Sequence, residues 1–158
     1  LKTAVLLAGS MQVGAIIART SAENIQLIYD FGESVGMVFQ LQDDLLDAFG
    51  NEDVFGKKNG GDIRTNKKTF LYLKALELAS PEQQKELMAL YSIQSENDDQ
   101  KVTRVLEIFQ ELNIENETKR LMDCYYDKGF KILEKIDLDE KKKRVLVKLA
   151  NSLMKRAN

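Results

Sequence analysis

The chain has 158 residues, of which 44% are hydrophobic and 30% charged, and its formal net charge is −2. This composition is typical of one globular domain with a hydrophobic core, and the charge argues against a nucleic-acid partner held by a generally basic surface. The absence of histidine excludes zinc triads and Ser-His or Cys-His catalysis within these residues, so a metal ion here would need oxygen ligands, as Mg²⁺, Mn²⁺ and Ca²⁺ do. The single cysteine, Cys124, excludes an internal disulfide, suits a cytoplasmic location and is interpreted as a small buried hydrophobe.

The first predicted helix runs from about Lys2 to Arg19 and is rich in alanine, leucine and isoleucine. Its apolar run, Ala4 to Ala18, is interrupted by glycines and polar residues and is too short to cross a bilayer, so no membrane span is predicted. Because the chain begins Leu1-Lys2-Thr3-Ala4, already in a helical pattern, we interpret it as the C-terminal portion of a longer protein. Thr20 and Glu23 have the spacing of a capping box, which is predicted to open the next helix.

A long second helix is predicted from about Ser21 to Ala48, with Gly32 and Gly36 in its interior. An interior glycine costs about 1 kcal/mol relative to alanine, so these two positions need a physical reason. One reason is the close approach of a neighbouring helix. The other is space for a ligand above the polar residues that follow, and the sequence leaves both open.

The end of this helix carries Gln40, Asp43, Asp44 and Asp47 on one stripe, because successive residues advance by about 100°. Leucines and a valine occupy the opposite side, so the helix is expected to be central in the fold. Neighbouring carboxylates on a helix repel one another, and a divalent cation would turn this repulsion into binding. The three aspartates are therefore a candidate metal site.

A long irregular segment, Gly50 to Lys68, follows the aspartates and holds five lysines and arginines between Lys57 and Lys68. Such glycine- and lysine-rich runs are often only solvated turns, but long loops in compact domains are frequently functional. Loop cations beside metal-binding carboxylates are what a polyphosphate ligand requires. The segment is therefore interpreted as a candidate diphosphate-binding loop.

The remainder is predicted to be helical, so the fold class is all-α. A helix from Thr69 to Ala79 is followed by the cap Ser80-Pro81-Glu82-Gln83, and a further helix opens at Asn97 or Asp98. The residues predicted to face the core are Val102, Val105, Leu106, Phe109 and Leu112, then Leu121, Met122, Tyr125, Ile132, Leu133 and Ile136, and finally Val145, Leu149 and Leu153.

These motifs together resemble a known family. Phe39-Gln40-x-x-Asp43-Asp44-x-x-Asp47, followed by Gly56-Lys57, Gly61-Asp62 and Asn66-Lys67-Lys68-Thr69, resembles the second aspartate-rich motif and loop of the trans-isoprenyl diphosphate synthases, or polyprenyl synthetases, which include farnesyl and geranylgeranyl diphosphate synthases. Lys2-Thr3 resembles the Lys-Thr element that precedes this motif. The resemblance implies the isoprenoid synthase fold, an all-α helical bundle around a central cavity. Residues 1–158 are then the C-terminal portion of a single polyprenyl synthetase domain whose upstream half is not present.

The resemblance also implies a reaction, in which an allylic diphosphate ionises, isopentenyl diphosphate attacks the carbocation and diphosphate is released. Mg²⁺ would be held by Asp43, Asp44 and Asp47. The leaving diphosphate would be contacted by Lys2, Lys57 and Lys67, with Lys58 as the alternative to Lys57. Thr3 and Gln40 would direct oxygen dipoles toward the allylic cation, which makes Lys2, Thr3 and Gln40 the predicted catalytic residues.

Two other hypotheses about function remain open. A terpene cyclase or squalene-synthase relative shares the implied fold and metal chemistry, although the loop motifs favour the chain-elongating synthases. A non-catalytic helical subunit of a prenyl synthase would be expected to lose the acidic stripe that this chain keeps. The family's first aspartate-rich motif is absent from these residues, so the chain alone is predicted to be inactive, and the family implies a homodimer. The product chain length is not determined.

Overall fold

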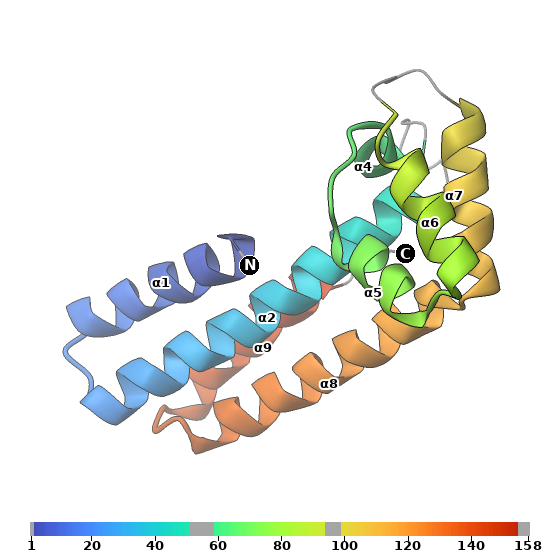
Figure 1. Cartoon of the computed structure of the whole chain (residues 1–158). Helices are drawn as coiled ribbons and strands as arrows, with labels where there is room; N and C mark the ends of the chain where they lie inside the picture. Colours follow the sequence, from blue (N-terminus) through green and yellow to red (C-terminus); the bar gives the residue numbers. More distant parts are fainter. Residues whose placement is uncertain (1, 51–58, 94–98, 155–158) are drawn as a thin grey trace. The chain divides into compact units, whose positions relative to one another are not determined.

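The computed structural model describes residues 2–50, 59–93 and 99–154, and in these residues all regular structure is helical, which confirms the all-α prediction. The helices are α1 (Lys2–Ile17), α2 (Ala22–Phe49), α4 (Gly61–Arg64), α5 (Phe70–Leu78), α6 (Pro81–Leu90), α7 (Asp99–Glu111), α8 (Ile114–Lys135) and α9 (Glu140–Met154) (Figure 1). None of the helices in the described part of the chain is long and apolar enough to cross a membrane. The chain divides into two compact units, Leu1–Gln42 with Leu121–Asn158, and Asp43–Arg120.

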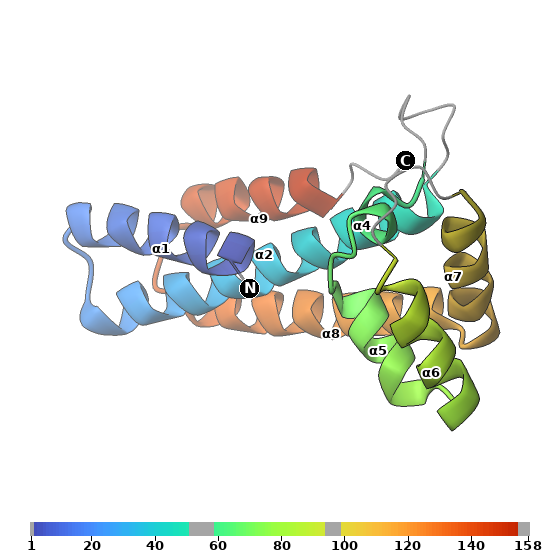
Figure 2. The same cartoon turned by 45° about the horizontal axis from the view of Figure 1, so that its top comes forward.

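The first unit contains α1, most of α2, the larger part of α8, and α9, which run side by side (Figures 1 and 2). Its core joins α2, α8 and α9 through the buried side chains of Phe31, Val35, Leu133, Ile136 and Ala150. Full burial of a side chain as large as Phe31 or Leu133 contributes about 1.5–3 kcal/mol, so this cluster supplies much of the unit's stability.

At Gly32 and Gly36 the backbone of α1 approaches α2 closely. A Cβ atom on Gly36 would lie 2.6 Å from the Cα atom of Ala4, and one on Gly32 would lie 2.9 Å from the Cα atom of Ala8. Ala4 and Ala8 are themselves fully buried. Of the two reasons that the sequence left open, close helix packing is therefore the one that the structure supports.

The beginning of α2 differs by one residue from the prediction. The helix begins at Ala22, so Ser21 is the capping residue, and its Oγ accepts a 3.2 Å hydrogen bond from the main-chain N–H of Asn24. The predicted capping box of Thr20 with Glu23 is therefore wrong. Asn24 is buried and its side-chain amide exchanges hydrogen bonds of 3.3 and 3.0 Å with the main chain of Asp137, which ties the start of α2 to the turn between α8 and α9.

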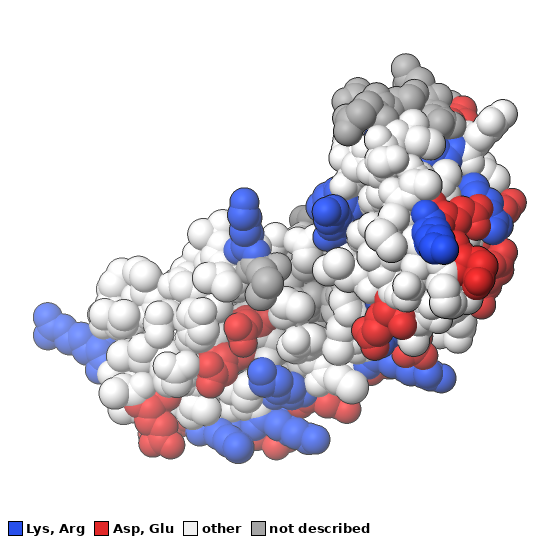
Figure 3. Space-filling view, in the orientation of Figure 1, with Lys and Arg blue, Asp and Glu red and all other residues white. Residues whose placement is uncertain are grey.

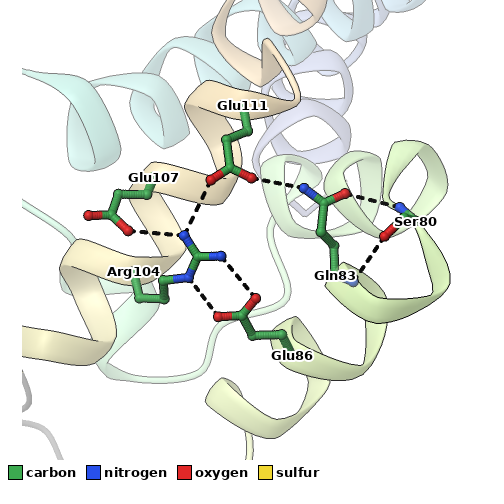
Figure 4. Close-up of polar contacts among 6 residues, drawn as sticks. All are labelled: Ser80, Gln83, Glu86, Arg104, Glu107 and Glu111. Carbon is green, nitrogen blue, oxygen red and sulfur yellow. Dashed lines mark hydrogen bonds and ion pairs between the residues drawn. The ribbon is translucent and has the colours of Figure 1, made fainter.

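The second unit packs α4, α5, α6 and α7 with the last turns of α2. Its buried apolar side chains are Leu45, Ala48, Ile63, Leu71, Tyr72, Ala75, Leu87, Tyr91, Val102, Val105, Ile108, Phe109 and Ile114. The capping box at Ser80 is confirmed, because Ser80 Oγ accepts from the Gln83 N–H and Gln83 Oε1 accepts from the Ser80 N–H (Figure 4). The sequence-predicted start of α7, at Asn97 or Asp98, lies outside the described residues.

A surface network joins α6 to α7. Arg104 donates to both carboxylate oxygens of Glu86, at 2.6 and 3.0 Å, and its third nitrogen donates to Glu107 and Glu111 (Figure 4). These contacts raise the pKa of Arg104 and lower that of Glu86, chiefly through the hydrogen bonds between the two side chains. Figure 3 shows the resulting mixture of red and blue groups over α6 and α7.

Several core assignments need correction. Val145 and Leu149 are 65% and 37% exposed, because α9 turns the next stripe, with Leu146 and Ala150, toward the core. Cys124 is exposed rather than buried. On α7 the fully buried side chains include Ile108, which the sequence prediction omitted, while Val102, Val105 and Phe109 are buried as predicted.

Candidate functional site

The three aspartates at the end of α2 differ in their exposure. Asp43 is exposed, Asp44 is 6% exposed and Asp47 is half-buried. Leu45, between Asp44 and Asp47, and Ala48, directly after Asp47, are buried in the core of the second unit, and Asp44 is buried with them.

Asp47 holds the beginning of α4. Its Oδ2 atom accepts a 2.9 Å hydrogen bond from the main-chain N–H of Asp62, and its main-chain oxygen accepts a 2.7 Å bond from the N–H of Gly60. Gly60 has a φ of 82°, and a Cβ on Gly61 would lie 2.9 Å from Oδ1 of Asp47. The backbone conformation therefore favours glycine at position 60, and a side chain at position 61 would displace the Asp47 carboxylate.

The pKa of Asp47 is raised above its ordinary value. Burial is the largest cause, and the charge of Asp62 acts in the same direction. The hydrogen bonds from the backbones of Asp62 and Gly61 and the charge of Lys67 offset part of this effect. The raised pKa means that ionisation of Asp47 costs more free energy than in water, and a nearby cation would reduce this cost.

Lys67 brings a positive charge to this end of α2. Its Nζ atom lies 2.6 Å from Oδ2 of Asp62 and 3.8 Å from Oδ1 of Asp44. Burial alone would lower the pKa of Lys67, but the hydrogen bond to Asp62 and the charges of Asp62, Asp44 and Asp43 outweigh it and raise the pKa. The Lys67 side chain is 49% exposed, so the ammonium is both firmly charged and accessible.

Within residues 2–50, 59–93 and 99–154, no three acidic, cysteine or histidine side chains converge closely enough to form a ready metal-binding group. The donors nonetheless suit a hard cation, because Asp43, Asp44 and Asp47 offer carboxylate oxygens from one stripe of α2. Mg²⁺ is commonly held by one or two carboxylates with the remaining positions filled by water and phosphate oxygens. The residues present therefore fit Mg²⁺ in the company of a phosphate ligand.

The structure also brings together two predicted residues of the first unit. Thr3 Oγ1 donates a 2.8 Å hydrogen bond to Oε1 of Gln40, across 37 positions of sequence. Lys2 is the first residue of α1 and is exposed. Lys57 and its alternative Lys58 lie outside the described residues.

Sequence reasoning assigned no role to three residues that the structure connects to this region. Asp62 is the nearest partner of Lys67, and its place in the Gly61-Asp62 element was the available signal. Asn66, the residue before Lys67 in the chain, accepts a 2.6 Å hydrogen bond from Lys101. Nothing in the sequence indicates a role for Lys101. It precedes a hydrophobic stripe, where a lysine is typical of a solvent-exposed helix start.

The fold is shared with a solved prenyl synthase. A crystal structure of a geranylgeranyl pyrophosphate synthase matches 99% of this chain and 49% of its own, with a TM-score of 0.85 and 38% sequence identity. The chain thus has the all-α isoprenoid synthase fold, as predicted. The family model described as polyprenyl synthetase matches residues 1–109, and the chain belongs to the polyprenyl synthetase family.

Two relatives show how much of such a protein the chain represents. It is 38% identical over 109 residues to a short chain isoprenyl diphosphate synthase of Methanothermobacter thermautotrophicus, which covers 69% of this chain and 33% of that protein. It is 33% identical over 139 residues to heptaprenyl diphosphate synthase component 2 of Geobacillus stearothermophilus, which covers 88% of this chain and 42% of that protein. The chain therefore spans between a third and a half of the length of these two relatives.

Proposed function

We propose that the protein containing this chain is a magnesium-dependent trans-prenyltransferase that condenses an allylic diphosphate with isopentenyl diphosphate and releases diphosphate. Residues 1–158 would form the C-terminal portion of its single polyprenyl synthetase domain. The observation that carries the proposal is the accessible Lys67 ammonium, 2.6 Å from Asp62 and 3.8 Å from Asp44 at the acidic end of α2. Membership of the polyprenyl synthetase family supports it.

Asp43, Asp44 and Asp47 would hold Mg²⁺, which neutralises charge on the leaving diphosphate when bound. Asp43 offers the most accessible carboxylate, whereas Asp44 is buried beside Lys67. Asp47 has a second task, because its Oδ2 atom already accepts the N–H of Asp62. The acidic stripe thus combines metal binding with support of the loop.

Lys67 would contact the diphosphate oxygens directly, with Lys2 and Lys57 in the same role. The carboxylates of Asp44 and Asp62 partly compensate the Lys67 charge, and the side chain is exposed enough to reach an incoming phosphate oxygen. A lysine placed here stabilises the negative charge that develops on the leaving group. Lys67 therefore binds the ground state and assists ionisation.

Thr3 and Gln40 would face the allylic cation. The Thr3 hydroxyl donates to Oε1 of Gln40, so the proton lies between the two oxygens and both carry negative partial charge. Oxygens fixed in this way stabilise a nearby carbocation without reorganising. Thr3 would act by orienting the Gln40 amide as well as by its own dipole.

The assignment is tested by Asp43→Ala in the intact protein. We expect turnover of the allylic diphosphate to fall by about two to three orders of magnitude, with a weaker dependence on Mg²⁺ and unchanged helicity by circular dichroism. Glu23→Ala is the matched control, since Glu23 is an exposed carboxylate near the other end of α2. Unchanged turnover in the Asp43 variant would refute the metal assignment.

A subunit of a multi-component prenyl synthase is the second candidate, and the similarity to a protein named as component 2 of a heptaprenyl diphosphate synthase is what favours it. A subunit of that kind would require a partner chain for activity, whereas a homodimeric synthase would not. Purified intact protein should therefore be assayed alone with both diphosphates. A terpene cyclase would instead form product from the allylic diphosphate without isopentenyl diphosphate.

The proposed partners follow from the surface of the first unit. On α1 several apolar side chains are exposed, namely Val5, Leu6, Val13, Ile16 and Ile17. Figure 3 shows an uncharged surface along much of this helix. We propose that the remainder of the synthase domain covers it, because the chain spans 49% of the solved synthase. Assembly into a homodimer and a cytoplasmic location belong to the same proposal.

A further inference from the structure

Lys101, in the first turn of α7, is a buried lysine that the proposed mechanism does not use. Only 2% of its surface is exposed. Lysine is rarely buried to this extent, because removing an ammonium group from water is costly unless other groups bind it. Its Nζ atom donates to Oδ1 of Asn66 at 2.6 Å and to the main-chain oxygen of Ile93 at 3.3 Å, and it lies 5.9 Å from the centre of the Tyr91 ring.

Asn66 accepts the shorter of the two hydrogen bonds that Lys101 donates. Its φ of 55° places it in the left-handed region, which asparagine tolerates better than most residues but which still has to be stabilised. Its side chain is fixed at both ends, because Oδ1 accepts from Lys101 and Nδ2 donates a 2.8 Å bond to the main-chain oxygen of Ile93. Lysine can only donate and a carbonyl can only accept, so Lys101 and the main-chain oxygen of Ile93 together fix the orientation of the Asn66 amide.

Asn66 immediately precedes Lys67 in the chain. The backbone conformation of Asn66 therefore sets the direction in which the Lys67 side chain points. The main-chain N–H of Lys67 donates to the oxygen of Asp62 at 2.9 Å, and its ammonium reaches the Asp62 carboxylate at 2.6 Å. A rotation at Asn66 would break both contacts. The conformation of one residue therefore decides whether Lys67 lies beside Asp44 and Asp62.

We propose that Lys101 is a positioning residue for diphosphate binding: its buried ammonium locks Asn66 in the left-handed conformation and so holds Lys67 where it meets the ligand. The proposal rests on the role of Lys67 in the proposed function. A purely apolar side chain of the same length would fill the same space, so packing alone does not explain a lysine at this position. Hydrogen bonds from a charged donor are about twice as strong as those from a neutral one, which suits the task of holding a strained residue.

The test uses the intact protein and three variants, Lys101→Met, Asn66→Gly and Lys67→Ala. Lys101→Met keeps the volume and removes the charge, and Asn66→Gly keeps the backbone conformation accessible and removes the amide. We expect each of these two to raise the KM for the allylic diphosphate and the inhibition constant of inorganic diphosphate by roughly tenfold. In the same variants, hydrogen exchange of the main-chain amides of residues 65–69 should become faster.

A double-mutant cycle separates positioning from general stability. If Lys101 acts through Lys67, combining Lys101→Met with Lys67→Ala causes no further loss of diphosphate binding beyond Lys67→Ala alone. The matched control is Asp99→Asn, which removes an exposed 2.5 Å ion pair from Asp99 to Arg64, another tie between α7 and α4. Its inhibition constant for inorganic diphosphate should stay within about twofold of that of the unmodified protein.

Each negative result has a separate meaning. If Lys67→Ala weakens diphosphate binding and Lys101→Met does not, or if the two losses add, the positioning role is wrong and the proposed function stands. If Lys67→Ala leaves diphosphate binding unchanged, the role of Lys67 in the proposed function is wrong and the inference built on it is overturned as well. Should Lys101→Met fail to fold, Asn66→Gly gives the same comparison with Lys67→Ala.

Discussion

The main-chain N–H of Asp62 donates a 2.9 Å hydrogen bond to Oδ2 of Asp47, so an acidic side chain of α2 supports the first turn of α4. The same side chain is a proposed metal ligand. These two tasks make different demands, because an N–H needs only an oxygen acceptor whereas Mg²⁺ prefers a carboxylate. Substitutions at Asp47 can therefore separate support of the loop from metal binding.

Asp47→Asn should retain the support of α4 and lose the metal ligand. The amide oxygen can still accept from Asp62, so we expect the free energy of unfolding to stay within about 1 kcal/mol while turnover falls at least tenfold. Asp47→Ala should lose both, and the unpaired N–H of Asp62 should cost about 1–3 kcal/mol. Urea unfolding and steady-state turnover of the intact protein measure the two effects. Full turnover in Asp47→Asn would argue against a role in metal binding.

Asp47 should also make stability depend on pH. Its pKa in the folded protein is raised above the ordinary 3.8, so the folded state binds this proton more tightly than the unfolded chain does. The contribution of Asp47 to the free energy of unfolding is therefore greatest at low pH and is lost as pH rises through the raised pKa. We expect the difference in stability between the unmodified protein and Asp47→Asn to shift in favour of Asp47→Asn as pH rises through the raised pKa of Asp47. A shift in the opposite direction would contradict the raised pKa.

Gly36→Ala should destabilise the packing of α1 on α2. The added methyl group would lie 2.6 Å from the Cα atom of Ala4, so one helix must move. We expect a loss of about 1–3 kcal/mol, larger than the gain of about 1 kcal/mol in helix propensity. Gly9→Ala is the control, since nothing lies within 4 Å of a Cβ at that position, and it should stabilise the protein slightly. Equal effects of the two substitutions in urea unfolding would show that α1 does not lie as described.

Arg104→Gln should remove the ion pair that lowers the pKa of Glu86. Because the hydrogen bond to Arg104 is the main cause of the lowered pKa of Glu86, that pKa should rise toward its ordinary 4.5 in the variant. Titration of the side-chain carboxyl by NMR measures this directly. Arg120→Gln, at an exposed pair with Glu117, should leave the Glu86 titration unchanged. The change in melting temperature should be small and should shrink at high salt, because these charges are largely exposed.

Residues 1–158 alone should associate in solution. Leu6 and Ile17 on α1 are 72% and 76% exposed, and apolar side chains gathered along one helix are normally covered by another surface. Native mass measurement at increasing concentration should show species larger than a monomer, and Leu6→Lys with Ile17→Lys should reduce them. A monomer at every concentration would show that the chain needs no covering surface.

The sequence by itself determined the features that depend on neighbouring residues. The helical period that puts Asp43, Asp44 and Asp47 on one stripe of α2 is local geometry. The capping box of Ser80 and Gln83 is likewise complete within four residues. The motif around Asp43 and the loop around Lys67 were therefore sufficient to predict both the family and the fold.

The tertiary structure decided what depends on contacts between distant segments. Whether Gly36 makes room for a ligand or for a helix is settled only by the position of Ala4, and the period of α9 does not reveal that Ala150 rather than Leu149 faces the core. The ties from Asp47 to Asp62 and from Lys101 to Asn66 span 15 and 35 positions. From its sequence alone a lysine such as Lys101 is predicted to lie on the surface. Its burial is decided by the packing of the whole chain and not by its local sequence.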